Sequence, residues 1–233
     1  MKRLPLLVLS SFLFGTQFLY PQQAVLTADS VQKALVFTSM EEALQDPSKV
    51  YRLDIGGQDL NVLPPEIGTL TNIQELNLSR NRIRSLPREL ASLRNLQILN
   101  LGNNPQLELV PALELLAKLH SLESLTLNAI GLTRLPPEIG MLRTLKRLIL
   151  YDNELTDLPL ELAPLDSLEV LDLHFNKIAV FPPIVTKLRN LRSIDFYDNQ
   201  MESLPADLGA MENLQALSLT WNRFVSLPPA SER

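Results

Sequence analysis

The sequence contains no cysteine among its 233 residues. Disulfides, thiol chemistry and a lipid-modified N-terminal cysteine are therefore excluded. Histidine is scarce as well, since only His120 and His174 occur, in different parts of the chain. A serine-protease-like arrangement would have to combine His174 with Asp172 and a hydroxyl such as Thr220, and neither an oxyanion hole nor a nucleophile elbow accompanies them. We therefore expect a protein without enzyme activity.

A glycine-rich phosphate loop is also lacking, because Gly56-Gly57 is followed by neither a helix nor a lysine. Basic residues are outnumbered, with 21 Lys and Arg against 26 Asp and Glu, which gives a formal charge of −5. Without residues 1–28, which hold Lys2 and Arg3 but no acid, the balance is 19 − 26 = −7. An acidic domain without a basic stripe argues against nucleic acid and anionic membranes as partners. No cofactor is expected.

The first twenty residues have a basic tip, Met1-Lys2-Arg3, followed by an apolar run that contains no acid. This layout predicts a secretory signal peptide over residues 1–28, with Ala24 and Ala28 as candidate cleavage sites. An uncleaved membrane anchor is the alternative, although the run is short for a span of about 20 residues. We expect a secreted, periplasmic or cell-surface protein that does not insert into the membrane after the leader is removed.

From residue 50 onward the chain repeats one unit eight times, as LKRLILYDNELTDLPLELAPLDS (145–167) and LEVLDLHFNKIAVFPPIVTKLRN (168–190) illustrate. The period is 23 residues, apart from one step of 26. The repeats start at Val50, Ile73, Leu96, Leu122, Leu145, Leu168, Leu191 and Leu214. Apolar residues at positions 4 and 6 of each unit predict a short strand, and the following L-P-x-x-L-x-x-L predicts a turn and a short helical stretch.

A single repeat cannot fold alone. Burying seven aliphatic side chains contributes roughly 1.5–3 kcal/mol each at most, whereas ordering 23 residues costs about 1–2 kcal/mol per residue for the backbone. Stacked units share their leucine layers and their strand partners. The pattern therefore predicts one elongated α/β domain, a right-handed solenoid whose eight short strands form a parallel sheet on the concave face.

Two further residue types recur at fixed positions. Position 9 is asparagine in six units, and its amide can satisfy backbone groups of the turn in neighbouring coils. Gln58 and Ile130 replace it in the first and fourth units, and we expect looser packing at Ile130, which cannot make these hydrogen bonds. Position 15 is proline in every unit, with Pro111 of the third unit following one extra residue, and proline fixes φ at about −65° in the turn.

These motifs resemble the short-repeat class of the leucine-rich repeat family, with its L-x-x-L-x-L-x-x-N-x-L-x-x-L-P pattern. This class occurs in many bacterial proteins and in Ras-pathway scaffold relatives of plants and animals. The resemblance covers residues 50–233. It implies a solenoid and a binding module, because the shared residues are the structural ones and members of the family mostly bind other molecules.

The two ends of the solenoid differ. Residues 29–49 are expected to form a helical cap, because Ser39 and Glu42 are spaced as a capping box and Pro47 closes the segment. The eighth repeat stops at SLPPASER, so its strand at 214–219 is expected to be an open edge. Truncation, a partner or self-association could each explain it. In the third repeat, the three additional residues predict a longer helix on the outer face at 112–120.

Exposed positions of the concave face are 3, 5, 7 and 8, because positions 4 and 6 point into the core. Those of the first four repeats are small and polar, whereas aromatic residues accumulate beside acids in the last four. Since adjacent strands are about 4.8 Å apart, position 7 should form a row of rings, with acids in the column beside it. Large rings at position 8 have a second interpretation, namely that they shield the turn. The candidate partner-binding residues are Tyr151, Asp152, Asp172, His174, Phe175, Asp195, Tyr197, Asp198 and Trp221.

Aromatic residues in an exposed row are typical of interface centres. The sequence therefore predicts a non-catalytic module that binds a protein or peptide, a basic one among the options, on the C-terminal half of the concave face. A structural or adhesive protein that self-associates through its C-terminal edge is the alternative. The acids and His174 are also considered as metal ligands, but acids on a strand face are usually solvated, so no metal site is predicted.

Overall fold

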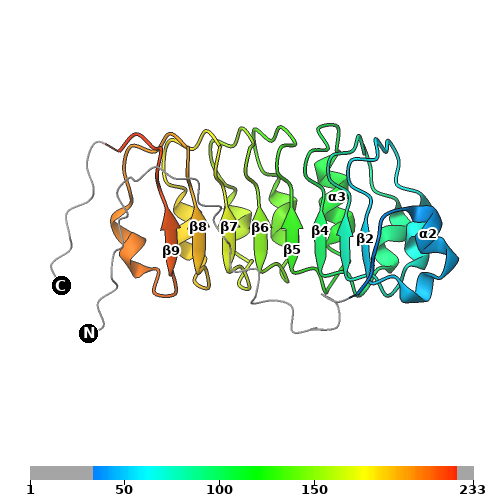
Figure 1. Cartoon of the computed structure of the whole chain (residues 1–233). Coiled ribbons are helices and arrows are strands. Elements are labelled where there is room, and N and C mark those ends of the chain that lie inside the picture. Colours follow the sequence, from blue (N-terminus) through cyan, green and yellow to red (C-terminus); the bar gives the residue numbers. More distant parts are fainter. Residues whose placement is uncertain (1–33, 225–233) are drawn as a thin grey trace. The chain divides into compact units, whose positions relative to one another are not determined.

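The computed structural model describes residues 34–224, and within them the sheet is continuous and entirely parallel (Figure 1). Its strand order follows the chain from β1 to β9. Equivalent positions of successive repeats are paired, so that Asp172 lies opposite Asp195. The strands are β1 (Val36–Phe37), β2 (Arg52–Asp54), β3 (Glu75–Asn77), β4 (Ile98–Asn100), β5 (Ser124–Thr126), β6 (Arg147–Ile149), β7 (Val170–Asp172), β8 (Ser193–Asp195) and β9 (Ala216–Ser218).

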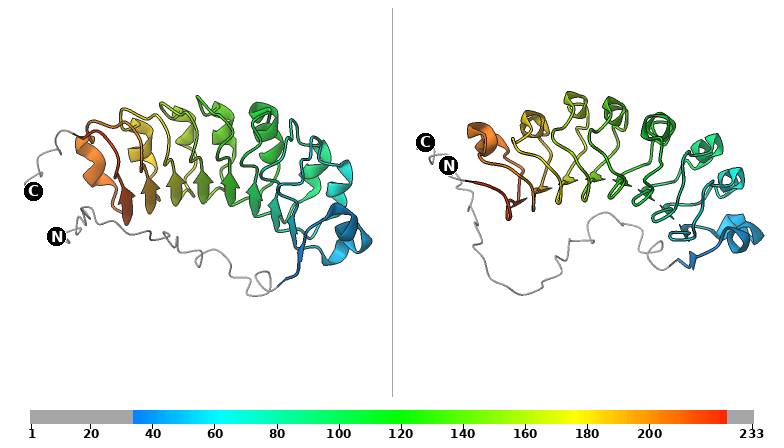
Figure 2. Two further views of the ribbon diagram at one scale, coloured as in Figure 1. Left: turned by 45° about the horizontal axis from the view of Figure 1, so that its top comes forward. Right: turned by 90° about the horizontal axis from the view of Figure 1, so that it is seen from above.

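Short helices form the N-terminal cap and the return legs of the repeats, opposite the sheet. In Figure 2 they line the outer side of the curved repeat domain, and the strands line the inner side. They are α2 (Met40–Gln45), η1 (Pro47–Lys49), η2 (Pro65–Thr69), η3 (Arg88–Ser92), α3 (Leu109–Leu116), η4 (Pro137–Met141), η5 (Leu160–Leu162), η6 (Pro183–Lys187) and η7 (Ala206–Ala210). Among these described residues, no helix is long and apolar enough to cross a membrane.

The core between the two layers consists of the repeated aliphatic residues, as the periodicity predicts. In the fifth repeat Leu145, Leu148 and Leu150 are fully buried. The expectation of an α/β leucine-rich repeat solenoid with a parallel sheet is confirmed. One strand was not expected: β1 adds a ninth strand to the predicted eight and pairs with β2.

The predicted N-terminal cap has the expected helix. The Oγ of Ser39 accepts a hydrogen bond from the Glu42 backbone N–H at 3.1 Å, which is the N-cap half of a capping box. Ala43 is fully buried, and Met40 and Leu44 pack against the core. The cap therefore covers the apolar end of the first coil. The predicted leader, residues 1–28, lies outside the described residues.

The asparagine ladder is present, and the two repeats that lack it have a different turn. Asn153 shows the regular pattern, in which Nδ2 donates to the backbone oxygen of Leu127 in the preceding coil (3.0 Å) and to that of Leu150 in its own (2.9 Å). Only the first and fourth repeats have a left-handed residue at position 10, where φ is 60° at Asp59 and 78° at Gly131. These are the repeats with Gln58 and Ile130 at position 9.

The expectation of looser packing at Ile130 is wrong. The turn is rebuilt so that Ile130 is only 7% exposed and belongs to the core, and its N–H donates to Asn153 Oδ1 at 3.2 Å. The longer helix of the third repeat is present as α3, but it begins three residues earlier than the predicted segment. Pro111 consequently lies inside the first turn of α3. The prolines at position 15 of the other described repeats are helix N-caps, as at Pro136, where φ is −62°.

Candidate functional site

The strands end in a turn whose position 8 is left-handed in every repeat. Its φ lies between 51° at Asp198 and 69° at Gly57. The conformation is held by the backbone, because the position-8 N–H donates to the position-7 carbonyl of the next coil, as from Phe175 to Tyr197 at 2.9 Å. Glycine adopts this region freely, whereas other residues pay roughly 1–2 kcal/mol. A bulky residue at position 8 therefore destabilises the fold relative to glycine.

Two such side chains are aromatic. Phe175 has φ 54° and is 46% exposed, and Trp221 has φ 61° and is 69% exposed. Rings exposed to this degree argue against the interpretation that they shield the turn. Because position 8 is left-handed in every repeat, this conformation belongs to the fold, and the exposure of the two rings is what distinguishes them.

Five rings from four successive coils form one continuous surface, which we call the aromatic surface: Tyr151, His174, Phe175, Tyr197 and Trp221. Tyr151 and His174 stack in parallel, with centroids 4.4 Å apart and planes at 8°. Phe175 packs edge to face on His174 (5.0 Å) and on Tyr197 (5.4 Å), and Tyr197 meets Trp221 at 6.3 Å. The predicted row at position 7 is thus present, with Phe175 inserted between His174 and Tyr197.

The acids at position 5 have a structural role first. Asp172 Oδ1 accepts from the backbone N–H of His174 (3.2 Å), and Asp195 Oδ1 accepts from that of Tyr197 (2.8 Å). In the early repeats asparagine makes the same bond, as where Asn77 Oδ1 accepts from the Ser79 backbone N–H. Asp172 is only 3% exposed and lies beneath His174. The predicted role of Asp172 in partner binding stays a prediction.

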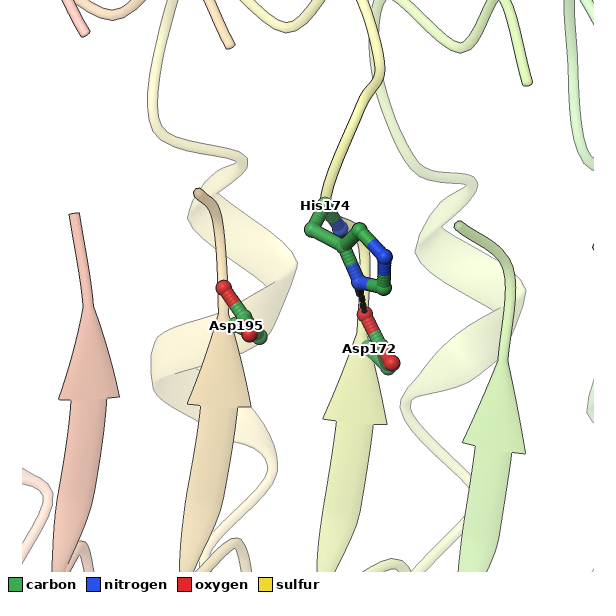
Figure 3. A group of neighbouring side chains, drawn as sticks. All are labelled: Asp172, His174 and Asp195. Carbon is green, nitrogen blue, oxygen red and sulfur yellow. Dashed lines mark hydrogen bonds and ion pairs between the residues drawn. The ribbon is translucent and has the colours of Figure 1, made fainter. Parts of the chain in front are cut away.

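Asp172 also binds the imidazole, and its Oδ1 lies 2.5 Å from His174 Nδ1 (Figure 3). Burial alone would lower the pKa of His174. The hydrogen bond to Asp172 and the negative charges of Asp172, Asp195 and Asp152 outweigh burial, so that the pKa of His174 is raised. His174 therefore gains protons at a higher pH than an ordinary histidine.

The same three side chains could hold a metal ion. Asp172, His174 and Asp195 each offer one ligand atom, and these atoms lie within 4.8 Å of one another. Three protein ligands are fewer than the four of a closed structural zinc site. Moreover, Nδ1 is already bonded to Asp172, so a metal at this nitrogen would have to displace that bond. The absence of a metal stays a prediction.

Asp152 and Asp198 flank the aromatic surface at position 8. Asp152 is exposed and Asp198 is half-buried. Burial, together with the charges of Asp172 and Asp152, raises the pKa of the Tyr151 hydroxyl. The charge of Arg80 acts in the opposite direction on Tyr151, although Arg80 belongs to the second repeat. Arg80 lies at position 8 of the second repeat, in the polar half of the concave face.

The first half of the concave face is small and polar, as predicted. Position 7 carries glycine, serine or asparagine there. A Cβ on Gly102 would lie 1.9 Å from Asn128 Oδ1, so this glycine makes room for the buried Asn128. Arg52 and Glu75 are joined by an ion pair of 2.7 Å. The other histidine, His120, is remote from the aromatic surface and lines a hollow of about 200 Å³ beside α3 and η4.

At the C-terminal end, β9 is the last strand of the described sheet. Ala216 is exposed, and Leu214, Leu217 and Leu219 are only partly buried against the core. Residues 225–233, which follow, lie outside the described range. The predicted self-association through this edge stays a prediction.

Comparison with known proteins identifies the family. The model described as leucine rich repeat matches residues 48–105, and that described as leucine-rich repeat region matches residues 135–227. The chain belongs to the leucine-rich repeat family. Proteins of this family and fold are typically non-catalytic interaction modules. The unmatched segment between the two models contains the inserted residues and the rebuilt turn at Ile130.

Solved structures with the same fold come from bacteria and plants. A leucine-rich repeat protein of Leptospira interrogans is 31% identical over 83% of this chain, with a TM-score of 0.65. Internalin C2 of Listeria monocytogenes is 28% identical over 72% of this chain and 70% of its own length (TM-score 0.57). The plant peptide hormone receptor RGFR1, solved in complex with RGF2, is 25% identical over 81% of this chain (TM-score 0.56). No curated protein matches the chain.

This chain spans 60% of the length of the Leptospira protein and 31% of that of the plant receptor.

Proposed function

We propose that this protein is an exported, non-catalytic module that binds a protein or peptide on the concave face of its C-terminal repeats. The observation that carries the proposal is the aromatic surface, in which rings from four coils touch one another and two of them stand on left-handed backbone. Tyrosine and tryptophan side chains are enriched at the energetic centres of interfaces. The plant receptor of the same fold, solved with RGF2, supports a peptide as the ligand.

Charge complementarity favours a basic partner. Asp152, Asp172, Asp195 and Asp198 lie on or beneath the aromatic surface. Among positions 3, 5, 7 and 8 of repeats five to eight, the only Lys or Arg is Arg147, at position 3 of the fifth repeat. Lysine and arginine side chains are attracted both by carboxylates and by the faces of tyrosine and tryptophan rings. We therefore infer that the partner offers an extended segment with lysine or arginine.

The test compares the whole chain with a variant in which Tyr151, Tyr197 and Trp221 are replaced by alanine. The probe is a fluorescein-labelled peptide of alternating arginine and glycine, and the same peptide with glutamate in place of arginine is its control. We expect the arginine peptide to bind the wild type, the glutamate peptide not to bind, and the triple variant to lose binding. Its circular dichroism should be unchanged, because exposed strand positions contribute little to a solenoid core.

The control variant is Arg52→Ala with Glu75→Ala, which removes a pair from the polar half of the face. Arg80 is unsuitable as a control, because its charge acts on Tyr151. If the Arg52 and Glu75 variant loses binding and the triple variant retains it, the proposed surface is wrong. The edge strand β9 then becomes the leading candidate, and self-association through it would be measured by sedimentation.

A further inference from the structure

His174 is the only described residue of the aromatic surface that can change its charge near neutral pH. Groups from three successive coils lie around its ring. Its own coil provides Asp172 and Phe175, the preceding coil Tyr151 and Asp152, and the following coil Asp195. Histidine is the one side-chain type in this set whose ordinary pKa lies between about pH 5.5 and 8.5. A charge change in this range therefore belongs to His174.

We propose that His174 couples binding at the aromatic surface to pH: neutral His174 admits the positive group of the partner, whereas protonated His174 opposes it. This inference rests on the proposed function. The parallel stack with Tyr151 and the bond to Asp172 fix the imidazole in the middle of the surface, so the ring cannot leave when a partner docks without losing both contacts.

The sign follows from the charges. Protonation adds one positive charge to a surface with four carboxylates, so a cationic partner is held less strongly at low pH. At a separation of about 6 Å and an effective dielectric constant between about 20 and 80, the added repulsion weakens binding by about 3- to 100-fold. Because the pKa of His174 is raised, the change should occur above pH 6.5, the usual value for histidine. By linkage, the bound partner lowers the pKa of His174.

Asp172→Asn is the variant that isolates the proton. Asparagine at position 5 already closes the strand at Asn77 and Asn100, so the substitution keeps the bond to the position-7 N–H. It removes the charge that most favours protonated His174. The matched control is Asp54→Asn, which makes the same change in the first repeat, where Asp54 closes the strand at Gly56.

The experiment has two readouts on the whole chain between about pH 5.5 and 8.5. NMR follows the imidazole of His174, assigned with the help of a His120→Gln variant, and fluorescence anisotropy follows binding of the arginine and glycine peptide. We expect binding to tighten about 3- to 100-fold as pH rises, with its midpoint at the pKa that NMR measures for His174. Asp172→Asn should shift both midpoints to lower pH together, and Asp54→Asn should shift neither.

The outcomes separate the two proposals. If the peptide binds and the triple aromatic variant does not, but affinity is constant while His174 titrates, pH coupling is wrong and the proposed binding surface stands. If Asp172→Asn moves the NMR midpoint without moving the binding midpoint, the pH dependence comes from another group and the coupling through His174 is wrong. If the peptide does not bind at any pH, both proposals fail.

Discussion

Removing one asparagine from the ladder tests how successive coils are held together. Asn176 is 7% exposed. Its Nδ2 donates to the backbone oxygen of Leu150 in the preceding coil (3.1 Å) and to that of Leu173 in its own (3.0 Å). Its Oδ1 accepts from the Leu155 N–H at 3.0 Å. The substitution Asn176→Ala removes these three bonds, together with a longer one from Nδ2 to the His174 backbone oxygen (3.3 Å), and introduces no new polar group.

Each bond contributes about 0.5–1.5 kcal/mol net, so we expect the free energy of unfolding to fall by about 2–4 kcal/mol. That is a large share of the roughly 5–15 kcal/mol that stabilises a typical domain. With a urea dependence of about 3 kcal/mol per molar, the unfolding midpoint should fall by about 1 M. Urea unfolding followed by circular dichroism measures this shift.

Asn222→Ala is the matched control. Asn222 makes the same three kinds of bond, to Phe196, Leu219 and Met201, but it is only half-buried. Water can replace part of what is lost there, so its substitution should have a smaller effect than Asn176→Ala. A loss below about 0.5 kcal/mol for Asn176→Ala, or a larger loss for Asn222→Ala, would refute the reasoning that buried ladder bonds hold the coils together.

Three further predictions concern packing, strain and pH. Gly102→Ala should destabilise the fold by about 1–3 kcal/mol in urea unfolding, because the added Cβ would collide with Asn128. Gly209→Ala is the control, because a Cβ there meets no described atom within 4 Å, and it should change stability by less than about 0.5 kcal/mol. Trp221→Asn should leave the urea unfolding midpoint unchanged or raise it, because asparagine tolerates the left-handed backbone better, and it should weaken peptide binding. A clear fall in the unfolding midpoint would show that the Trp221 ring stabilises the fold by packing. Because the pKa of His174 is higher in the folded than in the unfolded protein, protonation of His174 stabilises the fold. This contribution is complete at a pH below the pKa of the unfolded state, and it disappears as pH rises through the pKa of the folded state. The wild type should therefore exceed Asp172→Asn in stability most at low pH, and a gap that widens with pH would contradict this assignment.

The sequence predicts those parts of the fold that depend on one residue type at one spacing. The leucine period yields the strands, the core and the order of the sheet, and asparagine at position 9 yields the ladder. The two-residue strand β1 was missed, because two residues show no periodicity. The rebuilt turn at Ile130 has a different signal, which is the neighbouring Gly131. Its φ of 78° suits glycine, and the missing amide at position 9 does not by itself indicate this turn.

For the candidate site, the sequence places the rings in adjacent coils but not against one another. Side-chain direction at position 8 depends on the left-handed backbone, for which glycine, asparagine and aspartate in half of the repeats were an available signal. The burial of Asp172 beneath His174 depends on rotamers, which a repeat pattern does not encode. The effect of the Arg80 charge on the pKa of Tyr151 likewise acts across the repeats between them. It cannot be read from spacing within one unit.

Trp221 is the only tryptophan of the chain, so its fluorescence reports on the aromatic surface alone. The most direct test of the binding proposal is quenching of this fluorescence by acrylamide, with and without the arginine and glycine peptide at saturation. Trp221 is 69% exposed in the free protein, and we predict that the bound peptide covers it and lowers the quenching constant at least about twofold. An unchanged quenching constant while anisotropy shows the peptide bound would contradict the account and place the binding site elsewhere.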